Sequence, residues 1–405
     1  MKLLKQFAWV SASRFAAAIL QALTFIVIAR ESSPSIFGLF ATFMGIALVV
    51  HTLFDLGISS YIVRTRAEDR ASPEIPFTLR LYRVLGIGQG ATLIGLGLVL
   101  SGTGGIDWFV FLPIALASAV ERQTDVRLGL SLADGDIWKN VLIQLIRRTL
   151  TLTLTLTLVR YLPALVSYGI SYFLGSTAGL VIAFALIHVG RISTTRTPLS
   201  RREIIRVSRP FWVNSLSAQL RNLDVLIVSM TSTAAAAGYY GAIARSISPL
   251  SMFSASLAAV IYPQAVRDRM SGTSTLTRPV LVVLAFLMIA YGVLAAGADM
   301  IVRLLLGDEY LPAVDGLRIV LLSLIFASLT AILTAILQAY RFEKVVGVIS
   351  ALTSILSLTG IFIGASLYGV TGAALGLAVA YVVQAVLMFA CGGPILLGRR
   401  RGKHV

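Results

Sequence analysis

The sequence predicts an all-α integral membrane protein, with about twelve transmembrane helices in two six-helix lobes related as parallel repeats. Three observations support this. Hydrophobic residues make up 57% of the 405 residues and charged residues 13%, with a mean hydropathy of +0.88, a composition that no water-soluble globular chain of this length tolerates. Many apolar segments are long enough to cross a bilayer core about 30 Å thick. The two halves also share short stretches in the same order.

The apolar segments set the expected transmembrane spans, and the loops between them are short. Each span needs roughly 20 mainly apolar residues. The expected spans are 7–29, 36–62, 80–100, 108–131, 139–159, 163–189, 208–231, 235–262, 279–298, 312–338, 345–367 and 370–392.

The stretch Thr149 to Leu158 alternates threonine and leucine, which is the period of a β-strand with one apolar face. A lone strand cannot satisfy its backbone hydrogen bonds in lipid. We therefore expect a helix here, with threonine hydroxyls donating to carbonyls one turn earlier.

A repeat relates the chain before and after the basic loop Gly190 to Val207. It predicts an N-terminal lobe over residues 1–200 and a C-terminal lobe over residues 201–405. The matching stretches are Trp9-Val10 with Trp212-Val213, Phe37-Gly38-Leu39-Phe40 with Ala237-Gly238-Tyr239-Tyr240, and Ile62-Val63-Arg64 with Ala265-Val266-Arg267.

Basic residues concentrate in alternate loops, which sets the expected orientation. About 23 lysines and arginines lie on one side of the spans, and only Arg30, Arg160 and Arg303 lie on the other. Because positively charged loops stay in the cytoplasm, we expect both termini there, in a multi-pass protein of the bacterial inner membrane.

Several classes of partner are not expected. The net charge of +16 comes from basic residues separated by spans, so we do not expect nucleic-acid binding. The single Cys391 and the dispersed His51, His188 and His404 predict no metal site. The chain has no GxxxxGK[ST] loop, and we expect neither a cofactor nor ATPase activity.

Two surface and packing features are also expected. Gly86 with Gly90, and Gly372 with Gly376, have the spacing that lets helix backbones approach closely in lipid. The amphipathic stretch Asp299 to Leu311 is expected to lie along the periplasmic surface.

Ionisable residues fall within the expected spans. Each would cost about 2.5 to 3.5 kcal/mol at the bilayer centre if it faced lipid, so the set predicts a water-accessible interior cavity. The alternative is that the charges form structural ion pairs, because several lie three or four residues apart on one helix face. These pairs are His51 with Asp55, Arg122 with Asp125, Arg221 with Asp224, and Asp315 with Arg318.

Arginines in such a cavity would suit an anionic headgroup, because guanidinium stays charged and binds phosphate with paired hydrogen bonds. Carboxylates and histidine could carry protons for coupling, or form ion pairs. The predicted substrate contacts are Arg14, Arg122, Arg147, Arg221, Arg245 and Arg318. The predicted coupling or ion-pair residues are His51, Asp55, Asp125 and Asp224.

Several stretches, in this order and spacing, resemble the polysaccharide exporters of the multidrug/oligosaccharidyl-lipid/polysaccharide (MOP) superfamily, especially the O-antigen (Wzx-type) flippases. The resemblance covers nearly the whole chain. The stretches are Phe37-Gly38-Leu39-Phe40 through Asp55-Leu56-Gly57, Ile62-Val63-Arg64, Arg221-Asn222-Leu223-Asp224, Gly238-Tyr239-Tyr240-Gly241-Ala242, Leu305-Leu306-Gly307-Asp308-Glu309-Tyr310 and Gly369-Val370-Thr371-Gly372-Ala373-Ala374.

The resemblance implies two six-helix lobes around a cationic central cavity that opens alternately to the cytoplasm and the periplasm. The implied cargo is an undecaprenyl-diphosphate-linked oligosaccharide, an O-antigen or exopolysaccharide repeat unit, flipped from the cytoplasmic to the periplasmic leaflet. The expected partners are this lipid-linked oligosaccharide, membrane lipids, and a polysaccharide polymerase or ligase.

Two alternatives stay open. A multidrug-type exporter of the same superfamily would share the fold, although the basic interior favours an anionic cargo. A membrane-embedded polysaccharide polymerase or ligase would usually carry catalytic residues on a large outer loop, and no expected outer loop is large. We therefore expect a transporter and not an enzyme.

Overall fold

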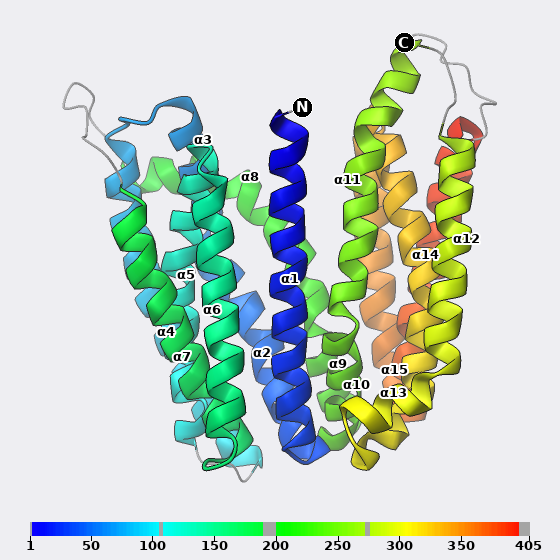
Figure 1. Cartoon of the computed structure of the whole chain (residues 1–405), viewed down its shortest axis with the longest axis horizontal. Coiled ribbons are helices and arrows are strands. Elements are labelled where there is room, and N and C mark those ends of the chain that lie inside the picture. Colours follow the sequence, from blue (N-terminus) through cyan, green and yellow to red (C-terminus); the bar gives the residue numbers. More distant parts are fainter. Residues whose placement is uncertain (1, 105–107, 189–199, 272–275, 397–405) are drawn as a thin grey trace. The chain divides into compact units, whose positions relative to one another are not determined.

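The computed structural model describes residues 2–104, 108–188, 200–271 and 276–396, and every regular element in these ranges is helical (Figure 1). The chain forms two compact units. Unit 1 comprises Met1–Ser32 and Leu39–Leu223, and unit 2 comprises Ser33–Gly38 and Asp224–Val405.

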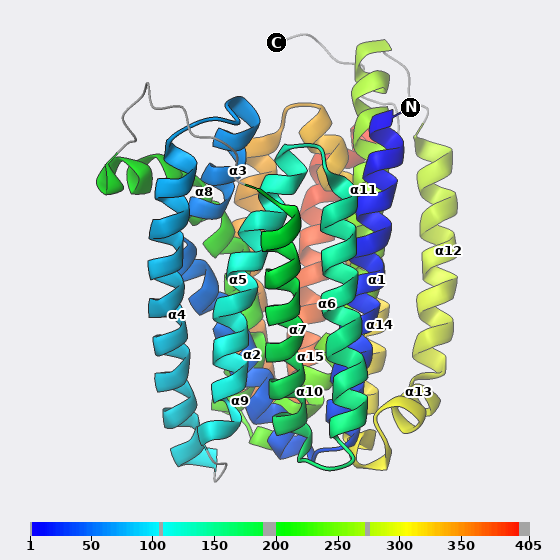
Figure 2. The ribbon, with the colours of Figure 1, turned by 60° about the vertical axis from the view of Figure 1, so that its left-hand side comes forward.

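Unit 1 is built from long helices that run alongside one another, as α5, α6 and α7 do in Figure 2. Its elements are α1 (Lys2–Arg30), α2 (Pro34–Asp55), α3 (Ile58–Glu68), α4 (Glu74–Gly104), η1 (Trp108–Val110), α5 (Leu112–Ala133), α6 (Ile137–Leu158), α7 (Ala164–Leu186), α8 (Arg201–Gln219) and η2 (Leu220–Leu223).

Unit 2 is built from helices of 8 to 54 residues, with the short helix α13 between α12 and α14 (Figure 1). Its elements are α9 (Asp224–Thr231), α10 (Ala234–Ser246), α11 (Ser248–Ser271), α12 (Thr277–Ala296), α13 (Ala298–Leu305), η3 (Asp308–Ala313), α14 (Val314–Ala339) and α15 (Glu343–Leu396).

Twelve spanning segments emerge from these elements. Eight helices of the described residues are long and apolar enough to cross a bilayer, and α15 counts twice because its backbone leaves helical geometry at Tyr368 and Gly369. Helix α5 is long enough, but four charges lower its hydropathy. The remaining two segments are interrupted, as α8 continues through η2 into α9 and α10 is followed directly by α11. The predicted helix count is confirmed.

The threonine–leucine stretch is helical, as predicted, and forms the second half of α6. The hydroxyls of Thr151 and Thr155 donate to carbonyls one turn earlier, at 2.9 and 2.7 Å. These bonds satisfy the two buried hydroxyls within the helix itself, which makes threonine compatible with a spanning helix.

A backbone break separates α2 from α3 inside unit 1. Leu56 and Gly57 both have positive φ, at 50° and 74°. At Gly57 an added Cβ would lie 2.3 Å from the carbonyl oxygen of Ser208, so only glycine allows α8 to pack here. The indole of Trp212 on α8 donates to the carbonyl of Thr52, at 3.0 Å, and satisfies one acceptor at the break.

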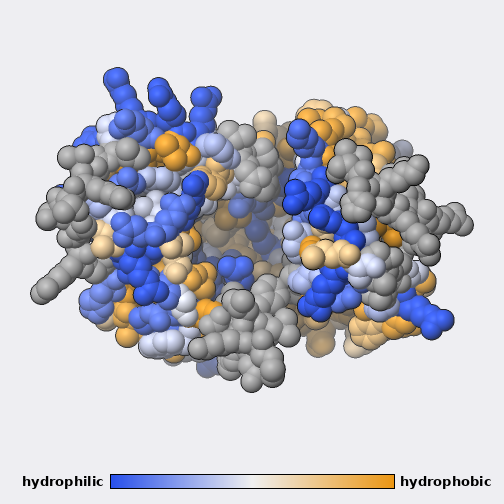
Figure 3. All heavy atoms as spheres, turned by 90° about the horizontal axis from the view of Figure 1, so that it is seen from above, coloured by the Kyte–Doolittle hydropathy of each residue, from blue (hydrophilic) through white to orange (hydrophobic). Residues whose placement is uncertain are grey.

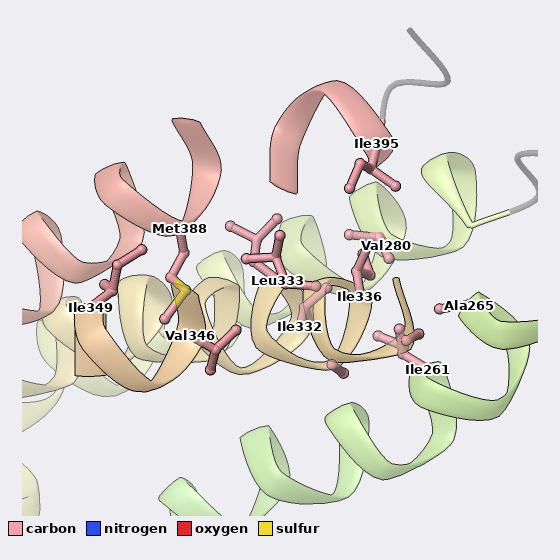
Figure 4. Packing of buried hydrophobic residues seen from close by; sticks show 13 residues of the cluster. Ile261, Ala265, Val280, Ile332, Leu333, Ile336, Val346, Ile349, Met388 and Ile395 are labelled. Carbon is pink, nitrogen blue, oxygen red and sulfur yellow. The ribbon is translucent and has the colours of Figure 1, made fainter. Parts of the chain in front are cut away.

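Unit 2 packs around an apolar cluster between α11, α12, α14 and α15 (Figure 4). Ile332, Leu333 and Ile336 of α14 lie at its centre and are fully buried. The two halves of α15 pack closely, because the backbone of Gly364 meets that of Gly372, and Gly360 meets Gly376. The predicted close packing at Gly372 and Gly376 is confirmed.

Repeat-equivalent glycines also meet within unit 2. A Cβ on Gly38 would lie 1.9 Å from the carbonyl oxygen of Ala234, and one on Gly238 would lie 1.8 Å from that of Pro34. The contact is therefore reciprocal, as expected where two related segments pack about a pseudo-two-fold axis. The sequence comparison had paired these two glycines.

Hydrophilic side chains gather over unit 1 at the end where α3 and the start of α4 lie, and over unit 2 at the end where α11 finishes (Figure 1 and Figure 3). The amphipathic α13 lies at the other end (Figure 1). It buries Ala298 and Val302 and exposes Met300 and Leu304, so the expected amphipathic helix is present.

Candidate functional site

An ion-pair network links α5, α6 and α7 inside unit 1. Arg147 bonds both carboxylates of α5, with Nη2 3.1 Å from Glu121 Oε1 and Nη1 2.9 Å from Asp125 Oδ1. Arg148 Nη2 lies 2.8 Å from the same oxygen of Glu121, and the hydroxyl of Tyr172 donates to the other. Two arginines thus neutralise two carboxylates.

Exposure within this network is uneven. The side chain of Arg147 is only 3% exposed and that of Glu121 13%, whereas that of Asp125 is 45% exposed. Gly179 of α7 makes room for the arginine, because a Cβ there would lie 3.3 Å from Arg147 Cδ. The network therefore holds the carboxylate of Asp125 through Arg147, while almost half of the Asp125 side chain stays exposed.

Arg122 lies one residue from Glu121 but points elsewhere and is completely buried. Its Nη1 donates to Gln89 Oε1 at 2.8 Å and to the carbonyl of His51 at 3.2 Å. Its Nη2 donates to the carbonyl of Phe54 at 2.8 Å, and its guanidinium stacks 4.0 Å above the ring of Tyr82. Arg122 therefore joins α5 to α4 and to the last turn of α2.

Asp55, the last residue of α2, is also buried. It accepts hydrogen bonds from the hydroxyl of Tyr82, at 2.9 Å, and from that of Ser59, at 3.0 Å. Tyr82 thus connects the carboxylate of Asp55 to the guanidinium of Arg122, so two buried opposite charges share one aromatic bridge.

In unit 2 the predicted residues are spread along the fold. Asp224 begins α9 and accepts a hydrogen bond from the hydroxyl of Tyr240, at 3.3 Å. Arg245 lies half-buried near the end of α10. Arg318 lies in the second turn of α14, where it pairs with Asp315 at 3.2 Å, and both side chains are exposed.

The remaining predicted arginines belong to unit 1. Arg14 is exposed on α1, and Arg221 is half-buried in η2. Unit 1 therefore brings Arg122, Asp125 and Arg147 into neighbouring positions on α5 and α6, while Arg14 lies on another helix.

The local pairing expected from helix spacing is found only in part. Asp315 and Arg318 form the expected ion pair. Asp125 pairs with Arg147 of the next helix and not with Arg122 on its own helix. Contacts between helices decide this, because Nη1 and Nη2 of Arg122 already donate to Gln89 and to two backbone carbonyls.

Several residues of the site were not singled out by the sequence. Tyr82, Gln89 and Tyr172 supply the neutral hydrogen-bonding groups around the charges. Polar residues within apolar spans are the signal that could have found them. Arg66 also forms a buried bidentate ion pair with Asp134, with both bonds at 2.9 Å.

The fold is that of the MOP-superfamily transporters. The structure is similar to an inward-facing multidrug resistance MATE family transporter, with a TM-score of 0.75 and 16% identity over 96% of each chain. It is also similar to the lipid II flippase MurJ in an inward closed conformation, with a TM-score of 0.74 and 15% identity, over 94% of this chain and 87% of that chain. It is similar as well to a MOP superfamily transporter from Pyrococcus furiosus, with a TM-score of 0.65 and 16% identity, over 98% of this chain and 96% of that chain.

Two family models, each described as polysaccharide biosynthesis protein, match residues 3–120 and 138–315. Together they span most of the chain. These matches, together with the similar structures, confirm the resemblance to polysaccharide exporters and flippases. Among curated proteins, no match to the sequence was found.

Proposed function

We propose that this multi-pass membrane protein flips an undecaprenyl-diphosphate-linked oligosaccharide from the cytoplasmic to the periplasmic leaflet of the bacterial inner membrane by alternating access. The matches to two models of polysaccharide biosynthesis proteins support a role in polysaccharide biosynthesis, and the fold supports a transporter. The bias of basic residues supports cytoplasmic termini.

The observation that carries the proposal is the accessible carboxylate of Asp125. It lies well inside α5, and its side chain is 45% exposed although Arg147 holds it. A carboxylate at this depth would cost about 2.5 to 3.5 kcal/mol if it faced lipid, so it faces water or a hydrophilic cargo. A helix bundle with a purely structural role would not need an exposed carboxylate at this position.

The arginines divide into two proposed roles. Arg122 and Arg147 make their hydrogen bonds and ion pairs within unit 1, and we propose that they hold the residues around Asp125 in position. Arg14 and Arg221 of unit 1, and separately Arg245 of unit 2, are the proposed contacts for the diphosphate, because each retains exposed surface. Guanidinium suits this ligand, since it binds phosphate oxygens in pairs.

Among the predicted coupling residues, Asp125 is the most accessible, and Asp55 is enclosed by hydroxyl donors. We therefore propose Asp125 as the group that exchanges an ion or proton during transport. His51, Asp55 and Asp224 are then structural, with Asp55 balancing the charge of Arg122.

The proposal is tested by measuring the lipid-linked oligosaccharide in cells that lack this protein. The leaflet is identified with a membrane-impermeant glycosidase applied to spheroplasts. Accumulation in the cytoplasmic leaflet supports a flippase. Accumulation in the periplasmic leaflet indicates a polymerase or ligase, and the absence of accumulation indicates another cargo, such as that of a multidrug exporter.

Variants in the same cells test the arginine roles. Arg221→Ala and Arg245→Ala should fail to restore transport while inserting at wild-type levels. Arg303→Ala is the matched control, because Arg303 is 53% exposed on α13 and belongs to no proposed site. Full transport by both test variants would overturn the assignment of Arg221 and Arg245.

A further inference from the structure

A groove of about 440 Å³ opens on unit 2, between α11, the end of α14 and the start of α15. Its lining combines an aromatic ring, a hydroxyl, an amide and a carboxylate with two alanines. These residues are Ala258, Tyr262, Thr334, Ala335, Gln338 and Glu343.

The polar groups of this groove are available for a ligand. Within the described part of the chain, the side chains of Tyr262, Thr334 and Gln338 make no hydrogen bond. Tyr262 is 44% exposed, and Glu343 is exposed at the first position of α15. A phenol, a hydroxyl and an amide therefore face the groove with donors and acceptors unused.

The groove is a feature of the repeat, because unit 1 has one at the equivalent place. That second groove, of about 370 Å³, lies between α3 and α5, and its polar lining includes Ser59, Arg64 and Asp125. The sequence offset that pairs Arg64 with Arg267 also pairs Ser59 with Tyr262, and each of these two residues lines its own groove.

The contacts of two arginines support this pairing of residues between the two units. Arg66 on α3 reaches Asp134 at the end of α5, and Arg269 on α11 donates to the carbonyl of Ala339, at 2.7 Å, at the end of α14. The same offset relates the two arginines. Each unit therefore holds the same pair of helices at one end by an arginine and opens a groove beside it.

The chemistry of the unit 2 groove fits a sugar better than a phosphate. Among the described residues no lysine or arginine lines it, so these residues offer no countercharge to a diphosphate. A pyranose has an apolar face of C–H groups that packs on an aromatic ring, and a rim of hydroxyls that both donate and accept hydrogen bonds. Tyr262 supplies the ring, and Gln338, Thr334 and Glu343 supply the complementary polar groups. The volume also falls in the range of small-molecule sites.

We propose that the groove of Tyr262, Thr334, Gln338 and Glu343 binds sugar residues of the transported oligosaccharide. This inference rests on the proposed function and adds the part of the chain that recognises the saccharide. The diphosphate contacts and the saccharide contacts then lie on different side chains, so the two can be separated by mutation.

The test uses the full-length protein in lipid nanodiscs with two probes. One is the lipid-linked oligosaccharide purified from cells that lack the protein, and the other is undecaprenyl diphosphate without sugar. Tyr262→Ala and Gln338→Ala should each weaken binding of the sugar-bearing probe about five- to tenfold, as expected for loss of a stacking or hydrogen-bonding contact of about 1 kcal/mol or slightly more. Binding of the bare diphosphate should be unchanged.

Phe286→Ala is the matched control, since Phe286 is 68% exposed on α12 and does not line the groove. It should leave both affinities unchanged. Equal weakening of both probes by Tyr262→Ala and Gln338→Ala, or no weakening of either, would overturn the sugar-binding groove while the flippase proposal stands. Failure of the wild-type protein to bind either probe would instead overturn the proposed function.

Discussion

The interiors of units 1 and 2 differ in chemistry although the two share one helical plan. In unit 1, α5 carries Glu121, Arg122 and Asp125 into the bundle, where each meets a partner on another helix. In unit 2, the repeat-equivalent α14 contributes Ile332 and Ile336 to an apolar cluster.

The difference shows that the fold does not require a charged interior. Unit 2 holds its helices by close packing of aliphatic side chains and glycines, which is how helices associate in lipid. Charges inside unit 1 carry a desolvation cost that apolar packing avoids. Their presence is therefore better explained by a hydrophilic cargo than by stability.

The largest expected loss of stability is in unit 1, on substitution of Arg147. Arg147→Ala leaves Glu121 and Asp125 without their shared partner and should lower the free energy of unfolding by about 3 to 5 kcal/mol. Thermal unfolding of the purified protein measures it. Adding Glu121→Gln and Asp125→Asn should recover part of the loss, and an unchanged Tm in the single variant would show that the network does not stabilise unit 1.

The contacts of Arg66 in unit 1 and of Arg269 in unit 2 allow the two units to be compared directly. Arg66→Ala should cost about 3 kcal/mol, because it removes the bidentate partner of the largely buried Asp134 and leaves that carboxylate only the exposed Arg70, at 3.4 Å. Arg269→Ala removes a bond to a carbonyl and should cost about 1 kcal/mol. Urea unfolding of both variants gives the two values, and equal costs would contradict the difference between charged and neutral acceptors.

Aliphatic packing should contribute equally in both units. Ile336 of unit 2 and Ile143 of unit 1 are both fully buried. Ile336→Val and Ile143→Val should each lower the free energy of unfolding by about 1 kcal/mol through loss of one methylene. A much larger cost in unit 1 would mean that its apolar residues, and not its charges, dominate its stability.

The smallest expected effect concerns the start of α8. Ser200 and Glu203 form a capping box, and hydrogen bonds from Ser200 lower the pKa of Glu203. A carboxyl with a lowered folded-state pKa stabilises the helix above its unfolded-state pKa and loses that contribution as pH falls through the folded-state value. Hydrogen exchange at the amides of Ser200 and Glu203, which the capping box bonds, should therefore quicken, after correction for intrinsic rates, under acidic conditions below the ordinary range of a glutamate. In Glu203→Gln this pH dependence should be absent, and its persistence would assign it to another group.

Much of the architecture follows from local sequence. Apolar length predicts twelve spans, because a helix must satisfy its own backbone in lipid. The threonine–leucine stretch could be assigned to a helix on the same ground, against its period. The repeat offset read from Gly38 and Gly238 also matches their reciprocal contact. The charges of the candidate site were visible too, as ionisable residues within apolar segments.

The sequence did not show which group each charged residue would contact or how exposed it would be, since both depend on side chains from helices far apart in sequence. Arg66 finds Asp134, and Arg122 finds Gln89 and backbone carbonyls, none of which lies on the same helix. The grooves likewise form only where helices from different parts of the sequence lie side by side. The sequence by itself determined which segments span the membrane and which of them carry charge. Only the tertiary structure decided which charges are enclosed and which face a ligand, because inter-helix packing sets the environment of each side chain.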